Sequence, residues 1–171
     1  MKKTVIILLM LFSQKLLAQS GSEANLKAAF IYNFTRYVEW DSASNGNKNN
    51  FTIGIIGSSP VSASLSEIAK TKKVGNKEII IRRYSRPEDI DDCHILFISK
   101  TLSFSLSSVL QQTGKGTLTV SESQGFAKQG TALNFFIDKN DKLKFEANLK
   151  ALLETDLKVS SQLLKLATIV D

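Results

Sequence analysis

The strongest constraint on the fold is a set of short, almost continuously apolar runs that alternate with helix-like segments. The runs at residues 51–57, 94–98 and 117–120 are rich in β-branched and aromatic side chains, which is typical of β-strands. Strands that are apolar throughout are buried on both faces, and they form parallel sheets covered by helices. The chain is therefore predicted to fold as one α/β layered sandwich with a mostly parallel sheet flanked by helices.

Periodicity and turn residues predict the remaining elements. An amphipathic helix is expected from Ser20, which with Glu23 forms a capping box, to about Glu39. The other predicted elements are an exposed loop at residues 41–50, a helix beginning at Pro60, a strand at 78–82, a helical turn at 87–92, a helix at 102–111, an antiparallel hairpin made of residues 131–137 and 142–147, and helices at 149–153 and 159–170.

The N-terminus has the pattern of a secretory signal peptide. Lys2 and Lys3 precede an apolar run at residues 4–12, and a more polar stretch then ends in Ala18. Cleavage is expected after Ala18, which divides the chain into a signal peptide, residues 1–18, and one domain, residues 19–171. The apolar run is too short to span a membrane, so the mature chain is not expected to insert into one.

The charge of the mature chain argues against nucleic acid as a partner. The full sequence has 22 basic and 16 acidic side chains, and Lys2, Lys3 and Lys15 lie in the predicted signal peptide, which leaves 19 basic side chains and a net charge of +3. Nucleic-acid binding requires a concentrated basic face, so it is not expected here.

The sequence lacks the residue sets of common catalytic and metal sites. The single cysteine, Cys93, and the single histidine, His94, are neighbours in a predicted strand, so their side chains point to opposite faces and cannot act as a pair. Cys93 is expected to be a buried thiol, and His94 a hydrogen-bonded core or edge side chain. Asp89, Asp91 and Asp92 are better explained by a solvated acidic turn than by a cation site. No enzymatic activity, metal or cofactor is expected.

The most unusual segment is the end of the first predicted helix, where aromatic and polar side chains are crowded together. Tyr32, Arg36 and Trp40 are the kinds of residue that binding surfaces favour. An equally good explanation is that Tyr37 and Trp40 close the bottom of the core.

Taken in order, the motifs of this chain resemble the YfiR family of periplasmic proteins. The resemblance covers nearly the whole mature chain. It rests on LKAAFIYNF at residues 26–34, VEW at 38–40, FTIG at 51–54, CHILFI at 93–98, LTVS at 118–121, GF at 125–126, NF at 134–135, FEANL at 145–149 and SSQLL at 160–164.

This resemblance implies a non-catalytic periplasmic regulator. Known members hold a membrane-bound diguanylate cyclase inactive through its periplasmic domain, which controls cyclic di-GMP and biofilm formation, and they are described as dimers with redox-sensitive cysteine pairs. The chain departs from this pattern because Cys93 is its only cysteine, so control by a disulfide is not carried over. The expected partner is the periplasmic domain of an inner-membrane signalling protein, either a cyclase or a similar sensor.

The positions carried as possible contacts to a partner or ligand are polar or aromatic side chains inside the matching motifs: Asn33, Arg36, Glu39, Trp40, Asn134, Glu146 and Asn148. The favoured alternative for the polar ones is structural, with Asn148 capping a helix and Glu146 paired to Arg36. The alternative function is a periplasmic receptor for a small ligand bound near Trp40. The edges of the hairpin at residues 131–147 offer a route to a homodimer unless helices cover them.

Overall fold

The computed structural model describes residues 21–40, 49–102 and 104–170. The predicted signal peptide and residues 41–48 of the predicted loop lie outside these ranges. No helix among the described residues is long and apolar enough to cross a membrane.

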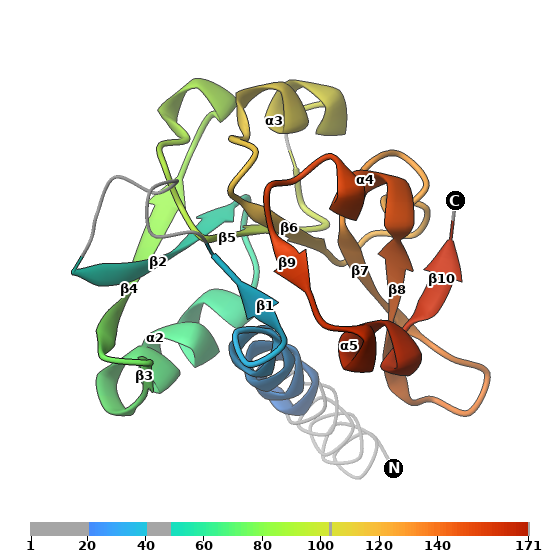
Figure 1. Ribbon diagram of the computed structural model, residues 1–171, viewed down its shortest axis with the longest axis horizontal. Coiled ribbons are helices and arrows are strands. Elements are labelled where there is room, and N and C mark those ends of the chain that lie inside the picture. The colour runs from blue at the N-terminus through green and yellow to red at the C-terminus, as the bar shows by residue number, and fades with distance from the viewer. Residues whose placement is uncertain (1–20, 41–48, 103, 171) are drawn as a thin grey trace, which may run out of the picture.

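An eight-stranded sheet forms the middle of the molecule, in the order β10-β8-β7-β6-β5-β2-β4-β3 (Figure 1). The five strands from β4 to β7 in this order run parallel, whereas β8 is antiparallel to β7 and β3 is antiparallel to β4. The strands are β2 (Asn50–Ile56), β3 (Lys73–Val74), β4 (Lys77–Tyr84), β5 (Ile95–Ile98), β6 (Leu118–Ser121), β7 (Leu133–Ile137), β8 (Leu143–Asn148) and β10 (Thr168–Val170).

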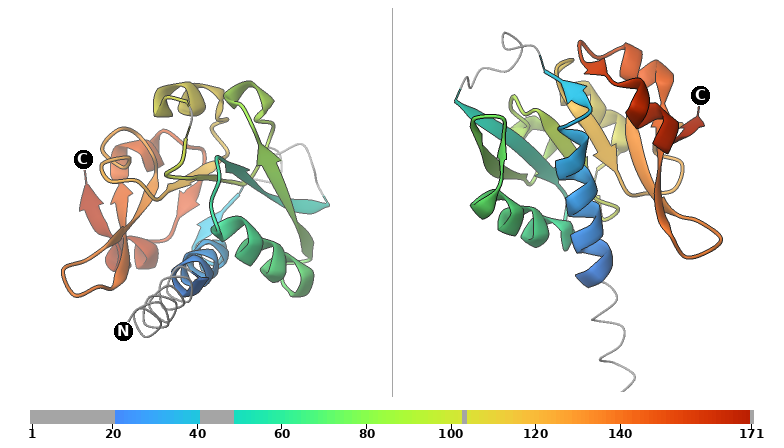
Figure 2. Two further views of the ribbon diagram at one scale, coloured as in Figure 1. Left: turned by 180° about the vertical axis from the view of Figure 1, so that it is seen from behind. Right: turned by 60° about the horizontal axis from the view of Figure 1, so that its bottom comes forward.

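Helices cover both faces of the sheet. The N-terminal helix (residues 21–34) lies on the same face as α2 (Val61–Thr71), and α3 (Leu106–Gln112) lies on the opposite face (Figures 1 and 2). The remaining elements are the 3-10 turn η1 (Pro87–Asp89), α4 (Leu149–Leu153), α5 (Ser161–Leu166) and a separate two-stranded sheet of β1 (Val38–Glu39) and β9 (Lys158–Val159). The predicted α/β sandwich with a C-terminal antiparallel hairpin is confirmed.

Strand β5 shows why its sequence is apolar at every position. Ile95 and Phe97 pack into the larger core, beneath the N-terminal helix and α2. Leu96 and Ile98 point to the other face and pack into a smaller core with α3. All four side chains are fully buried, since alternate residues of a strand face opposite sides and both sides are covered.

The N-terminal helix is shorter than predicted. It ends at Phe34 instead of continuing to Glu39, and residues 35–37 form turns in which each backbone N–H bonds to the carbonyl three residues earlier. Val38 and Glu39 then pair with β9 in antiparallel register. The apolar spacing of this segment resembles a helix, but pairing with a strand distant in sequence overrides that local pattern.

The helix predicted at residues 159–170 is confirmed only in its middle part. Only Ser161–Leu166 is helical, and Thr168–Val170 forms β10, which pairs in parallel with β8. The β-branched residues of this segment satisfy the backbone of β8 along its outer edge. On the other side of the hairpin, β6 pairs with residues 133–134 of β7, so strands of the same chain cover the hairpin edges at residues 133–134 and 146–148, and the outer strands of the sheet are β10 and β3.

Two further predicted elements are shorter than expected. The helix expected at residues 102–111 begins at Leu106, where the side chain of Ser105 caps it by accepting a hydrogen bond from the backbone N–H of Ser108. The helical turn expected at residues 87–92 is limited to Pro87–Asp89.

A cluster of phenylalanines fixes the N-terminal helix to the hairpin. The ring of Phe34 stacks on Phe135 with centroids 5.9 Å apart and meets Phe145 edge-on at 5.1 Å. Phe30, one turn earlier, contacts the same two rings at 6.0 and 6.1 Å. Burying these large rings is the main apolar contribution that holds the helix on β7 and β8.

We predict that Phe34→Ala lowers the free energy of unfolding by about 3–5 kcal/mol, because it removes a buried ring and leaves a cavity between the helix and the sheet. Urea denaturation followed by circular dichroism measures this change. Leu153→Ala is the control, since the Leu153 side chain is 85% exposed, and it should change stability by less than about 0.5 kcal/mol. Equal losses in the two variants would contradict the proposed role of the cluster.

Candidate functional site

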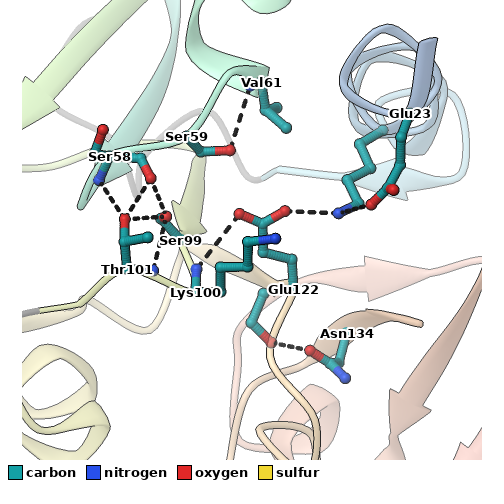
Figure 3. Close-up of polar contacts among 11 residues, drawn as sticks. Glu23, Ser58, Ser59, Val61, Ser99, Lys100, Thr101, Glu122 and Asn134 are labelled. Atoms are coloured by element: carbon teal, nitrogen blue, oxygen red, sulfur yellow. Dashed lines mark hydrogen bonds and ion pairs between the residues drawn. The ribbon is translucent and has the colours of Figure 1, made fainter. Parts of the chain in front are cut away.

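The carboxyl ends of β2, β5 and β6 bring polar side chains from three loops together (Figure 3). Ser58 follows β2, Ser99 and Thr101 follow β5, and Glu122 follows β6. In open parallel sheets this edge is the usual place for a functional site, because the loops at the strand ends are free to vary while the sheet holds them in place.

Hydrogen bonds clamp the loop after β2 to the loop after β5. The hydroxyl of Ser99 donates to the carbonyl of Ser58 at 2.6 Å, and the backbone N–H of Ser58 donates to Thr101 Oγ1 at 3.1 Å. Thr101 Oγ1 also donates to the carbonyl of Ser58. These side chains fix the relative position of the two loops.

An ion pair joins the N-terminal helix to the end of β6. Lys27 Nζ lies 2.7 Å from Glu122 Oε2 and 2.6 Å from Glu23 Oε1, and the side chains of Lys27 and Glu122 are only 9% and 4% exposed. Glu122 Oε1 also accepts the backbone N–H of Lys100 at 3.4 Å. Burial acts to lower the pKa of Lys27, but its hydrogen bonds to Glu122 and Glu23 outweigh this effect and raise the pKa above its ordinary value.

A second buried polar contact is a row of hydrogen bonds that runs from β6 across β7 to β8. The hydroxyl of Ser121 donates to Asn134 Oδ1 at 2.7 Å, and Asn134 Nδ2 donates to Glu146 Oε2 at 2.9 Å. Asn134 is 1% exposed, so its amide is held in one orientation by these two contacts. Two of the candidate residues, Asn134 and Glu146, are thus brought together.

Among these hydrogen-bonded residues, Glu146 lies at the surface, beside a cavity. It lies partly exposed beside a space of about 450 Å³ that Glu122 and Asn134 also line. The suggested pairing of Glu146 with Arg36 is wrong, since its hydrogen-bond partner is Asn134 on the neighbouring strand and no ion pair joins it to Arg36 among the described residues. Its side chain therefore joins the buried hydrogen bonds to the surface of this cavity.

Asn148 has a structural role. Its Oδ1 accepts the backbone N–H of Ala151 at 2.9 Å and caps α4, and its Nδ2 donates to the carbonyl of Ala127 at 2.7 Å. Both ends of the amide are therefore hydrogen-bonded within the protein. This confirms the prediction that Asn148 caps a helix.

The candidate residues near the end of the N-terminal helix lie elsewhere. Asn33, Arg36 and Glu39 are exposed, and no hydrogen bond or ion pair in the described part of the chain joins their side chains to Asn134 or Glu146. Glu39 lies opposite Lys158 in the pairing of β1 with β9. These three residues, called the helix-end group below, form a polar surface separate from the buried hydrogen bonds between Ser121, Asn134 and Glu146.

Trp40 closes the core at the amino end of the sheet. Its indole N–H donates to the carbonyl of His94 at 2.9 Å, and its ring meets Phe51 edge-on at 5.0 Å. Both the apolar ring and its polar atom have partners within the protein, which agrees with the alternative that Trp40 is a core residue.

His94 and Cys93 are buried as predicted and face different surroundings. His94 is 3% exposed, its Nδ1 accepts the backbone N–H of Thr52 at 3.1 Å, and its ring stacks on Phe51 at 4.4 Å. Burial, with a smaller effect from Lys77, lowers the pKa of His94 to about 4. Cys93 packs into the smaller core beside Tyr84, where burial raises the pKa of its thiol to about 12. A neutral thiol of this kind is a poor nucleophile.

Two of the three acidic residues considered as cation ligands, Asp89 and Asp91, have partners within the protein. Asp89 pairs with Arg86 at 2.8 Å, and Asp91 contacts Arg82 and the hydroxyl of Tyr84. The described residues contain no group of three or more histidine, cysteine, aspartate or glutamate side chains placed to hold a metal ion.

The sequence analysis missed the ion pair between Lys27 and Glu122. Its local part was visible, because Glu23 and Lys27 have the i, i+4 spacing of helical salt bridges. The second acid is 95 residues away in sequence, and only the fold brings it to the helix. The serine and threonine clamp was also missed, since each of its loops looks like an ordinary turn.

We predict that Lys27→Met lowers the free energy of unfolding by about 3 kcal/mol or more, because it leaves the buried carboxylate of Glu122 without its cation. Lys70→Met is the matched control, since Lys70 pairs with Glu67 at the same 2.7 Å distance, but both side chains are about two-thirds exposed or more. That variant should lose no more than about 1 kcal/mol. Chemical denaturation of both variants tests the difference, and similar losses would contradict it.

We also predict that His94 makes stability fall in mild acid. Its pKa is about 4 in the folded protein and near 6.5 when unfolded, so the unfolded chain binds an extra proton as the pH falls from 6.5 towards 4. The resulting loss amounts to about 3 kcal/mol at pH 4. Urea midpoints measured across this range should fall less steeply for His94→Gln than for the unmodified protein, whereas parallel curves would contradict the role of His94.

Comparison with known proteins identifies the family. Curated protein sequences gave no match. The family model described as YfiR/HmsC-like matches residues 24–168, which runs from the N-terminal helix to the first residue of β10 and includes every candidate residue named above. The chain therefore belongs to the YfiR/HmsC-like family.

Proposed function

We propose that this protein is a periplasmic regulator that binds and represses a membrane signalling partner and so controls cyclic di-GMP signalling and biofilm formation. The observation that carries the proposal is membership of the YfiR/HmsC-like family over residues 24–168, since this family suggests a periplasmic regulator of cyclic di-GMP signalling. The proposed partner is the periplasmic domain of an inner-membrane diguanylate cyclase or a similar sensor.

The surroundings of the reactive groups support binding over catalysis. A nucleophilic enzyme needs an accessible nucleophile beside a base, whereas the thiol of Cys93 is buried and His94 is occupied by the backbone of Thr52. Family membership points the same way, because YfiR-like proteins are regulators. We therefore propose that the protein acts by contact and without enzymatic activity.

The helix-end group is the proposed contact surface. Asn33, Arg36 and Glu39 are exposed, whereas Trp40 and Asn148 use their polar atoms inside the protein. Arginine on a surface with nearby aromatic residues is typical of binding hot spots, and Tyr37 lies partly exposed next to Arg36. Glu146 is a second candidate contact because it is partly exposed and lines the neighbouring cavity.

Export and assembly complete the proposal. We propose cleavage after Ala18, which releases residues 19–171 into the periplasm. A homodimer remains part of the proposal, and its interface does not use the parts of the hairpin edges that β6 and β10 cover, at residues 133–134 and 146–148.

A second candidate function is that of a receptor for a small ligand. The observation that favours it is a cavity of about 580 Å³ beside the carboxyl ends of β2 and β4 and the loop after β5. Trp40 does not line this cavity and lies at the other end of the strands, so the ligand site expected around Trp40 is replaced by one at the carboxyl edge.

We predict that a photo-cross-linking residue in place of Asn33 captures an inner-membrane protein in intact cells. Adding Arg36→Glu should reduce the yield by about tenfold, since loss of one well-placed interface charge costs about 1.4 kcal/mol or more. The same variant should raise cellular cyclic di-GMP, because the partner is no longer repressed. Mass spectrometry of the captured protein and assay of the nucleotide measure the two effects.

The matched control is Arg86→Glu, which changes another exposed arginine far from the helix-end group in sequence. It should leave both the capture and the cyclic di-GMP level unchanged. Thermal unfolding of both variants shows that each is folded. Capture without any inner-membrane protein, or equal effects of the two variants, would contradict the proposed contact surface.

A further inference from the structure

The order of the parallel strands creates a crevice between β2 and β5. The chain leaves β2 through α2 to form β4 on one side, and it later forms β5 on the other side of β2. The helices that follow β2 and β5 therefore pack on opposite faces, as the separate core contacts of α2 and α3 show. In open parallel sheets, ligands bind where two such connections diverge.

A cavity of about 580 Å³ lies at this point, a size within the range of roughly 300–1,000 Å³ that small-molecule sites have. Its walls come from the loop after β2, the first turn of α2, the end of β4 and the loop after β5. Gly57 allows the loop after β2 to turn sharply, since its φ is +87° and a Cβ there would lie 3.0 Å from that of Ser99.

The charge of this cavity is positive. Arg83 is the charged residue in its wall, and none of the described residues that line it carries a carboxylate. The neighbouring arginines are neutralised, Arg82 by Asp91 and Arg86 by Asp89, whereas no ion pair to Arg83 occurs among the described residues. The positive end of the α2 dipole faces the same region, because Ser62 and Ala63 of its first turn line the cavity.

Hydroxyl groups supply further hydrogen bonds. Ser58, Ser59, Ser62, Ser85 and Thr101 all line the cavity. Ser62 Oγ is buried and is the one such side-chain atom without a hydrogen-bond partner in the described part of the chain. Buried polar atoms are normally satisfied, so this hydroxyl is an unused hydrogen-bonding group in the first turn of α2, which borders the cavity.

The remaining wall is apolar. Leu102 and Phe104 lie in the loop after β5, and Phe104 is 40% exposed despite its large ring. An exposed aromatic at the mouth of a cavity can cover the apolar part of a ligand.

We infer that this cavity binds a small organic anion, with its carboxylate or phosphate held by Arg83 and the serine hydroxyls and its apolar part against Phe104. The inference rests on the second candidate function, a small-ligand receptor at this same cavity, and not on the proposed membrane partner. The site also differs from the cavity beside Glu146, which is lined by carboxylates and suits no anion.

The test uses the purified mature protein labelled with ¹⁵N and titrated with phenylphosphate, inorganic phosphate and the uncharged benzyl alcohol. Phenylphosphate should produce saturable shifts of the amide signals of Ser58, Ser62 and Thr101, and benzyl alcohol should not. Signals of Thr52 and His94, at the opposite end of the strands, should stay in place. Absence of saturation with phenylphosphate, or an equal response to the uncharged compound, would overturn the inference.

Two variants divide the site into its charged and apolar parts. Arg83→Gln should weaken phenylphosphate binding by about tenfold or more, and the matched control Arg86→Gln should not change it. Phe104→Ala should weaken binding of phenylphosphate but leave that of inorganic phosphate as it was. All three substitutions are at exposed side chains, so the variants are expected to fold, and unchanged binding by Arg83→Gln would overturn the assignment.

Discussion

The fold depends on the complete burial of its central strands. β2 and β5 carry apolar side chains towards both faces, so each face must be covered by helices. Parallel neighbours also require crossover connections that return the chain to the same end of the sheet. The loops after β2, β5 and β6 therefore lie together at the carboxyl end of the sheet. This constraint places Ser58, Thr101 and Glu122 close together although they are far apart in sequence.

His94 holds together the amino ends of the same strands, at the opposite end of the sheet. Its backbone N–H donates to the carbonyl of Thr52, and its ring Nδ1 accepts the backbone N–H of the same residue. Its carbonyl accepts hydrogen bonds from the backbone N–H of Leu118 and from the indole N–H of Trp40. A histidine that makes these contacts must stay neutral, because a protonated ring nitrogen cannot accept a hydrogen bond. The low pKa of His94 therefore belongs with the contacts that hold this end of the sheet, and its position in an apolar strand fits this structural role.

The sequence predicted the elements whose local pattern and tertiary environment agree. β5 is apolar at every position because it is buried on both faces, and the hairpin is marked by its turn at Asp138, whose carboxylate accepts the backbone N–H groups of Asn140 and Lys142. β10 was missed because Ala167 and Val170 continue the helical spacing of Leu163, and nothing local reveals that β8 has a free edge to fill. At the candidate site, the sequence indicated Asn134 and Glu146 as polar residues in apolar motifs. It did not reveal the pairing of Lys27 with Glu122, which depends on the whole fold.

The N-terminal helix and the residues that follow it connect the carboxyl ends of the central strands with their amino ends. Near its start, Lys27 is bound to Glu122 beyond the end of β6, and after its end Trp40 is bound to the carbonyl of His94 just before β5 begins. Phe30 and Phe34 hold the helix against the hairpin between these two points. The helix-end group thus projects from a segment fixed on both sides. Little conformational entropy would be lost in ordering its backbone on contact with a partner, so the binding free energy of such a surface comes mainly from the side chains themselves.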